Sequence, residues 1–162
     1  MPVYNYFDPG FPGMKADSGD DRVESFPVKA PGLAFGVICG TDATGALVPG
    51  PGTKVRGGTI HSHAVRGQYN ATTGQREYAA TECASVMTRG LAWMRVTAAG
   101  AVTEGGPVSF AADGTVADGT VANAGANLLA NAVFRSAKVT TADGIDIAVV
   151  EFHNPFSKTT GP

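Results

Sequence analysis

Glycine and proline interrupt this chain so often that no long helix fits between them. The 162 residues include 22 Gly and 10 Pro, together about one residue in five. Glycine destabilises the interior of a helix and proline breaks it. The apolar stretches between these breaks are short and alternate with a period of two, the pattern of a strand with one buried face. The spacing predicts about eight short strands with turns roughly every 8–12 residues, in a small all-β sandwich, jelly-roll or barrel-like domain.

Composition excludes several other classes. The chain has 25 Ala and 17 Val but only five Leu and four Ile, which is unlike a helical bundle or a coiled coil. Charged residues make up 16% and the net charge is −2, so a phosphate-binding surface is not expected and nucleic acid is not a predicted partner. No apolar stretch approaches the roughly 18 residues of a membrane span, so no membrane association is expected. The 43% apolar content is too high for a disordered chain.

The predicted organisation is one domain with two extensions. Residues 1–31 are expected to form an extended arm rich in Pro, Gly and aromatic residues, because prolines exclude this stretch from helices and from the interior of a sheet. A single β domain is expected over residues 32–156, followed by a flexible tail over 157–162. Aromatic side chains in the arm predict that it packs on a neighbouring subunit or on its own domain; they are Tyr4, Tyr6, Phe7 and Phe11.

Local patterns predict the individual strands. Leu33, Phe35, Val37 and Cys39 share one face of an opening strand. Further strands are expected at 59–65, 83–87, 91–96, 108–110, 133–139 and 145–152, with Gly90 separating 83–87 from 91–96. Ala92, Met94 and Val96 would lie on one face, and Trp93 and Arg95 on the other.

The segments between these strands carry weaker signals. Residues 66–80 are expected to form a polar loop or an irregular hairpin. An Asp-Gly turn of type I′ is predicted within the tandem repeat over 113–122. One helical turn is considered at 123–131, and the adjacent Val149 and Val150 suggest a bulge or a change of face.

Candidate chemistry is sparse. His61 and His63 would point the same way from a strand, and with His153 they are the only histidines. A metal site needs further ligands, so the favoured interpretation is two polar side chains on a solvated or subunit-facing strand surface. Cys39 and Cys83 are not in a C-x-x-C pair and are interpreted as reduced core thiols of a protein made in the cytosol. No catalytic motif is present, and no enzyme activity, cofactor or metal is predicted.

The aromatic and histidine residues each suggest one function. Trp93, Tyr69 and Tyr78 would suit a sugar-binding groove on a β-sandwich, which makes a carbohydrate-binding module one candidate. A small metal enzyme would use His61 and His63. Each hypothesis requires its residues to meet on an accessible surface.

In the order of its features the chain resembles the decoration, or structural cement, proteins of tailed bacteriophage capsids. The resemblance covers roughly residues 13–152 and rests on these stretches: Gly13-Met14-Lys15-Ala16-Asp17, Asp21-Arg22-Val23-Glu24-Ser25, Pro31-Gly32-Leu33-Ala34-Phe35-Gly36-Val37, Ser85-Val86-Met87-Thr88-Arg89-Gly90-Leu91-Ala92-Trp93-Met94-Arg95-Val96, Gly105-Gly106-Pro107-Val108-Ser109-Phe110, Asp113-Gly114 and Val149-Val150-Glu151-Phe152. The insert at 66–80 and the tandem Asp-Gly repeat depart from the pattern.

The resemblance implies a virion protein that binds the outside of the major capsid protein shell and stabilises it. Synthesis in the host cytoplasm and assembly as a homodimer or homotrimer follow from the same expectation. Aromatic residues dominate interface energetics. The expected interface residues are therefore Tyr4, Tyr6, Phe7, Phe11, His61, His63 and Trp93.

Overall fold

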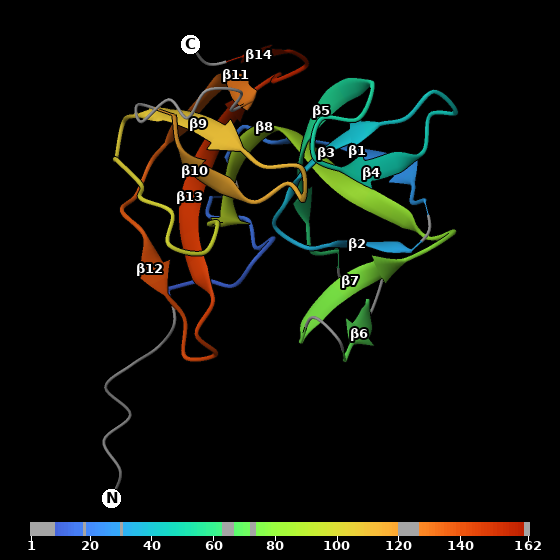
Figure 1. The fold of residues 1–162 in the computed structure, drawn as a ribbon, viewed down its shortest axis with the longest axis horizontal. Coiled ribbons are helices and arrows are strands. Elements are labelled where there is room, and N and C mark those ends of the chain that lie inside the picture. Colours follow the sequence, from blue (N-terminus) through green and yellow to red (C-terminus); the bar gives the residue numbers. More distant parts are fainter. Residues whose placement is uncertain are drawn as a thin grey trace, which may run out of the picture.

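Every regular element in the described part of the chain is a β-strand. The computed structural model describes residues 9–17, 19–29, 31–62, 67–71, 74–119 and 127–160, and no helix occurs among them. Eleven strands form one curled antiparallel sheet and three short strands form a second sheet (Figure 1). The all-β class predicted from the spacing of glycine and proline is confirmed.

The large sheet follows the order β10-β9-β11-β13-β8-β5-β3-β4, with β1 also paired to β8, β12 to β13 and β14 to β11. Its strands are β1 (Arg22–Pro27), β3 (Ile38–Thr41), β4 (Leu47–Pro49), β5 (Lys54–Ile60), β8 (Cys83–Arg95), β9 (Pro107–Phe110), β10 (Val116–Asp118), β11 (Asn127–Phe134), β12 (Val139–Thr140), β13 (Asp146–His153) and β14 (Lys158–Thr160). The small sheet contains β2 (Gly32–Ala34), β7 (Gln75–Ala79) and β6 (Gln68–Asn70) in that order.

The long strand β8 joins the two halves of the molecule. Figure 1 shows it running from the half that holds β3 and β5 into the half that holds β9, β11 and β13. Two separate strands were expected around Gly90, but β8 is continuous there and Gly90 has a φ of 120°. This backbone conformation is rare for residues with a Cβ. The glycine therefore lets one strand change direction rather than ending it.

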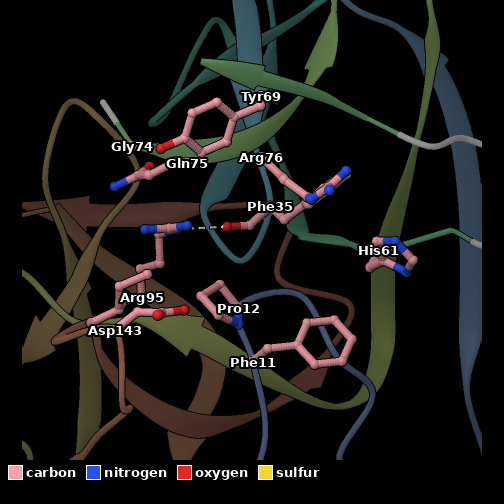
Figure 2. Close-up of a pocket in the computed structure, with 11 residues that line it drawn as sticks. Phe11, Pro12, Phe35, His61, Tyr69, Gly74, Gln75, Arg76, Arg95 and Asp143 are labelled. Carbon is pink, nitrogen blue, oxygen red and sulfur yellow. Dashed lines mark hydrogen bonds between the residues drawn. The ribbon is translucent and has the colours of Figure 1, made fainter. Parts of the chain in front are cut away.

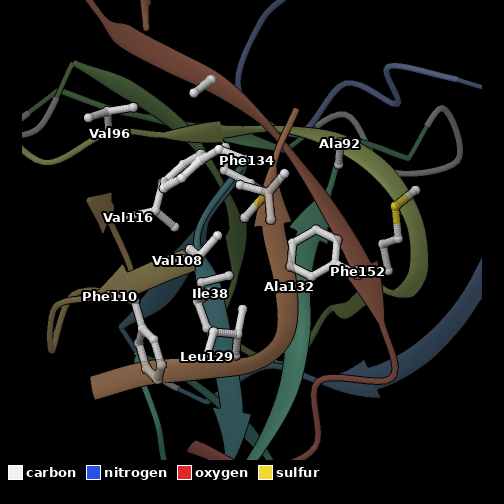
Figure 3. Close-up of a cluster of buried hydrophobic side chains, with 14 of the residues drawn as sticks. Ile38, Ala92, Val96, Val108, Phe110, Val116, Leu129, Ala132, Phe134 and Phe152 are labelled. Atoms are coloured by element: carbon white, nitrogen blue, oxygen red, sulfur yellow. The ribbon is translucent and has the colours of Figure 1, made fainter. Parts of the chain in front are cut away.

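The main core lies inside the curl of the large sheet. Figure 3 shows side chains from β3, β8, β9, β10, β11 and β13 meeting there, with Phe134 and Phe152 among the largest. Ala92, Met94 and Val96 belong to this cluster, which confirms the face predicted for them. Period-two alternation located these residues because it depends only on the local chain.

The predicted opening strand is split in two. Leu33 lies in β2 and Cys39 in β3, with a turn at Phe35 and Gly36 between them. These side chains and Val37 still pack in one second cluster around Tyr78. The buried set was predicted correctly, while the continuous strand was wrong because Gly36, at a φ of 70°, turns the chain.

Both faces of β8 and β13 are covered. Val150 packs in the main core, whereas Val149 packs with Trp93 and Ile147 in a third cluster on the opposite face. The register between β13 and β8 is continuous from Ile147 to His153, so the adjacent valines mark no bulge. Two apolar neighbours in one strand reflect burial on both sides of the sheet.

The regular domain extends beyond residues 32–156 at both ends. Residues 22–27, within the expected arm, form β1 and pair with the first half of β8. Residues 158–160, within the expected tail, form β14 and pair with β11. Pro27 is tolerated because it ends β1, and the preceding residues of the strand have free N–H groups for pairing.

Three connections differ from expectation or refine it. Residues 66–80 contain the short hairpin of β6 and β7, so the irregular-hairpin interpretation is confirmed. Of residues 123–131, the structure describes 127–131, which begin β11 and form no helical turn. The hairpin between β9 and β10 closes through residues 111–115 with a positive φ at Gly114 but not at Asp113, so the turn is not of type I′.

Candidate interaction surface

Residues 13–16 pair with the edge of β8, with an antiparallel bridge between Lys15 and Ala92, and residues 9–12 precede them on the domain surface. Phe11 and Met14 close a turn through a 2.9 Å hydrogen bond from the Met14 N–H, with Gly13 at a φ of 80°. The Gly13 N–H then donates to the carbonyl oxygen of Trp93 at 2.8 Å, and the Trp93 N–H donates to that of Met14 at 2.9 Å. Gly10 lies directly on the indole, since a Cβ there would be 2.5 Å from the Trp93 Nε1. This part of the expected arm packs on its own domain.

Aromatic rings gather where this segment meets β5. The His61 ring stands edge-on to Phe11, with centroids 5.7 Å apart, and to Phe35, with centroids 5.2 Å apart. Phe35 continues the stack onto the buried ring of Tyr78 at 4.8 Å. Phe11 is 46% exposed, so the stack runs from the core to an accessible aromatic surface. Such T-shaped pairs favour a fixed arrangement of the rings.

A cavity of about 410 Å³ opens beside this stack. Three segments that are distant in sequence build its wall: residues 11–12, the β6–β7 hairpin and the loop before β13 (Figure 2). Tyr69 from the hairpin is 65% exposed, so it adds a second accessible aromatic ring. Asp143 and Ile145 contribute the wall on the β13 side.

Arg95 lies in the middle of this wall. Its Nε donates a 3.0 Å hydrogen bond to the carbonyl oxygen of Phe35, as Figure 2 shows, and the residue is only 6% exposed. Burial disfavours the charged form and lowers the pKa of Arg95 to about 10. Among the described residues no carboxylate oxygen lies within 4.0 Å of the guanidinium. A buried cation therefore borders an open cavity and forms no ion pair with the described part of its own chain.

The structure brings together three of the expected interface residues. Phe11 and His61 contact each other, and Trp93 lies under the same N-terminal segment. Trp93 is 8% exposed, so it supports this surface from below and presents little of its own ring. The other four expected residues, Tyr4, Tyr6, Phe7 and His63, lie outside the described residues.

Arg95 and Tyr69 were not among the expected interface residues. A signal for Arg95 was present, because it is the one charged residue in the apolar run Leu91–Val96. The sequence carried a weaker signal for Tyr69, because this residue lies in a polar segment whose packing depends on distant parts of the chain. Period-two alternation placed Arg95 on the face of Trp93 but carried no information about the cavity there.

Two of the three aromatic rings expected to line a sugar-binding groove are buried. Trp93 is 8% exposed and Tyr78 is fully buried, which leaves Tyr69 as the accessible ring of the three. The Tyr78 hydroxyl donates to the carbonyl oxygen of Ile60 at 2.5 Å and accepts from the Ser85 N–H, so its role is structural. A sugar-binding groove of stacked aromatic rings is not supported.

The remaining His, Cys and acidic residues of the described part of the chain form no metal site. No three His, Cys, Asp or Glu residues gather there as metal ligands, and His153 pairs instead with Glu151 at 2.8 Å. Cys39 and Cys83 are free thiols; burial raises the pKa of Cys39, whereas Cys83 is exposed at the start of β8 and is not the core thiol expected from the sequence. No helix that is long and apolar enough to cross a membrane was found among the residues described.

Comparisons with known proteins agree with the fold. The model of one family, described as structural cement protein (E217 gp24/Pam3 gp6), matches residues 2–153. A search of curated proteins found no match. A chain from a structure titled "The capsid of Myoviridae Phage XM1" superposes with a TM-score of 0.71 at 20% identity, over 96% of this chain and 97% of that chain. Since the family model spans nearly the whole sequence, the chain belongs to the structural cement protein family of bacteriophages.

Proposed function

We propose that this protein binds the outer surface of the shell formed by a bacteriophage major capsid protein and stabilises that shell. The observation that carries the proposal is the family match over residues 2–153. A structural role accords with the absence of catalytic motifs from the sequence. The mature location would be the virion, after synthesis in the host cytoplasm.

The architecture suits a rigid clamp. Apolar side chains cover both faces of β8 and β13, so the domain has a core on each side of its central strands. A rigid body loses little conformational entropy when it binds. Forces from a packaged genome would then pass between capsid subunits through the domain with little internal rearrangement.

The N-terminal segment supplies the proposed contacts. Residues 13–16 are held on the edge of β8 by backbone hydrogen bonds, which fix this end of the N-terminal segment on the domain surface. We assign contacts with neighbouring subunits to Tyr4, Tyr6 and Phe7, together with the exposed ring of Phe11. Aromatic side chains offer large contact area with few rotatable bonds.

Many copies would act together on one shell. A homodimer or homotrimer fits this role, because two or three linked contacts raise the avidity of each unit. Each individual interface then requires only modest affinity. Neither nucleic acid nor a membrane has a part in this proposal.

The test uses shells assembled from the major capsid protein of the phage that encodes this chain. We expect the purified protein to co-sediment with shells, to bind the free capsid subunit much more weakly, and to raise the temperature at which the shells rupture. A variant lacking residues 2–8 should keep the far-ultraviolet circular dichroism spectrum of a β protein but bind shells more weakly. Shells that neither retain the intact protein nor gain resistance to heat would refute the proposed function.

A further inference from the structure

Arg95 borders more than one hollow of the surface. The cavity beside Phe11 and two others, of about 460 and 270 Å³, all have Arg95 and Gln75 in their walls. The three cavities adjoin at Arg95 and Gln75, and we call them together the groove. Their combined size suits a short extended peptide better than a small ion.

The guanidinium of Arg95 has no ion-pair partner among the described residues. The Nε of Arg95 is bonded to the Phe35 carbonyl, but a carbonyl carries no net charge. Three carboxylates line the cavities. Asp143 is exposed on the wall beyond ion-pair distance, and Asp113 accepts hydrogen bonds from the N–H and hydroxyl of Thr115. Asp146 pairs with Lys138 at 3.2 Å. Burying a cation without a partner is costly, and a carboxylate that matches the planar guanidinium removes much of this cost.

Apolar surface lies beside the charge. Phe11 is 46% and Tyr69 65% exposed at the margin of the first cavity. Arg76 adds a second guanidinium at the same margin. A ligand that fits this pattern carries a carboxylate close to an apolar side chain.

We infer that the groove binds an extended segment of the major capsid protein, with an Asp or Glu carboxylate on Arg95 and a neighbouring apolar side chain between Phe11 and Tyr69. This inference rests on the proposed function and names the chemistry of the partner. Because Arg95 has no ion-pair partner among the described residues, its guanidinium favours a segment that brings a single carboxylate to it. The position favours the capsid protein, because Phe11 at the groove belongs to the same N-terminal segment that is proposed to contact it.

Substitutions at the groove test the charge. Gln75→Glu places a carboxylate of nearly the same shape beside Arg95, where it competes with the partner, and it leaves the Arg95–Phe35 hydrogen bond in place. Asn154→Asp makes the same charge change at an exposed turn outside the groove, at a φ of 55° that Asp tolerates. We expect Gln75→Glu to weaken shell binding at least tenfold and Asn154→Asp less than twofold. Equal effects of the two variants would overturn the inference.

We expect replacement of Arg95 to weaken shell binding more than Gln75→Glu does. Arg95→Gln should weaken shell binding by about 30-fold or more, since it leaves the partner's carboxylate buried without a counter-charge. Thermal unfolding of each variant checks that the domain is intact, and Gln75→Glu provides the test independently if Arg95→Gln does not fold. Wild-type protein that fails to bind shells removes the proposed function together with this inference, whereas wild-type binding that both variants retain overturns the inference alone.

A zero-length crosslink identifies the occupant. Arg95→Lys presents a primary amine to the groove, and a carbodiimide joins an amine to a carboxylate in direct contact with it. We expect mass spectrometry of crosslinked, decorated shells to find position 95 joined to an Asp or Glu of the major capsid protein. A crosslink to a second copy of this chain, or no crosslink on shells that carry the variant, would overturn the assignment.

Discussion

The contact between Gly10 and Trp93 makes a sharp test of how the N-terminal segment is attached. Replacement by Ala would place a Cβ 2.5, 2.6 and 2.7 Å from three atoms of the indole ring. Carbon atoms in contact lie about 3.5–4.0 Å apart, so roughly 1 Å of overlap must be relieved. Hydrogen bonds of Gly13 and Met14 to the Trp93 backbone hold the segment on one side, which limits how far it can shift in place.

The expected cost follows from this geometry. Forcing one additional carbon into a packed site typically costs about 1–3 kcal/mol. If residues 9–12 instead move away from the indole of Trp93, we expect a loss of folding free energy of similar size, because the part of the indole that Gly10 covers becomes exposed to solvent. We therefore expect Gly10→Ala to lower the free energy of unfolding in urea by about 1–3 kcal/mol.

Tryptophan fluorescence reports the displacement directly. Trp93 is the only tryptophan, and it is 8% exposed. In Gly10→Ala we expect a red-shifted emission maximum and faster quenching by acrylamide. Gly19→Ala is the matched control, since its Cβ would meet only the Asp17 side chain at 3.4 Å or more and its φ is not positive. Unchanged emission and stability in Gly10→Ala would show that residues 9–12 do not pack on the indole in solution.

Three further predictions concern the body of the domain. Tyr78→Phe should cost about 1–3 kcal/mol of unfolding free energy in urea, since it removes a buried hydroxyl bonded to two backbone groups, while Tyr69→Phe on the exposed rim should cost almost nothing; equal losses would contradict this. A colorimetric thiol reagent should modify Cys83 rapidly in the native protein and Cys39 only on unfolding, because Cys39 is buried and burial raises its pKa; two fast thiols would contradict the structure. Hydrogen bonds from the Lys29 ammonium and from Thr44 and Ala46 hold the pKa of Asp42 below its usual range. The ionised Asp42 therefore stabilises the folded state fully above the unfolded pKa of about 3.9, and this stabilisation is lost as pH falls through the lower folded pKa. The stability advantage of wild type over Asp42→Asn should therefore shrink on acidification below about pH 4, and a constant difference would refute the assignment.

The buried faces of the strands were predictable because alternation is local. Ala92, Met94 and Val96 point into the main core, as their period-two spacing indicated. Leu33 and Cys39 were placed in one cluster even though a turn separates their strands. Side-chain direction in an extended chain depends on the neighbouring residues, so it survives errors in the ends of strands.

Strand pairing was less predictable. Residues 22–27 show no clear alternation and end in Pro27, yet they form β1 against residues of β8 about sixty positions away. The burial of Trp93 likewise depends on Gly10, which comes from the arm that was expected to pack on a neighbouring subunit or on its own domain. Such contacts join residues that are far apart in the sequence, and short-range alternation does not indicate which segments will pair.

By itself the sequence determined the all-β class, the buried residues of the stretches 33–39 and 91–96, and the family resemblance. Glycine and proline placement and short-range alternation carry this information because they are properties of neighbouring residues. Only the tertiary structure decided the candidate site. Phe11, Tyr69 and Arg95 come from an N-terminal turn, a hairpin and the end of β8, and they meet because the sheet curls and the N-terminal segment returns across it. An arginine in an apolar strand becomes a groove-lining cation only through the elements that fold around it.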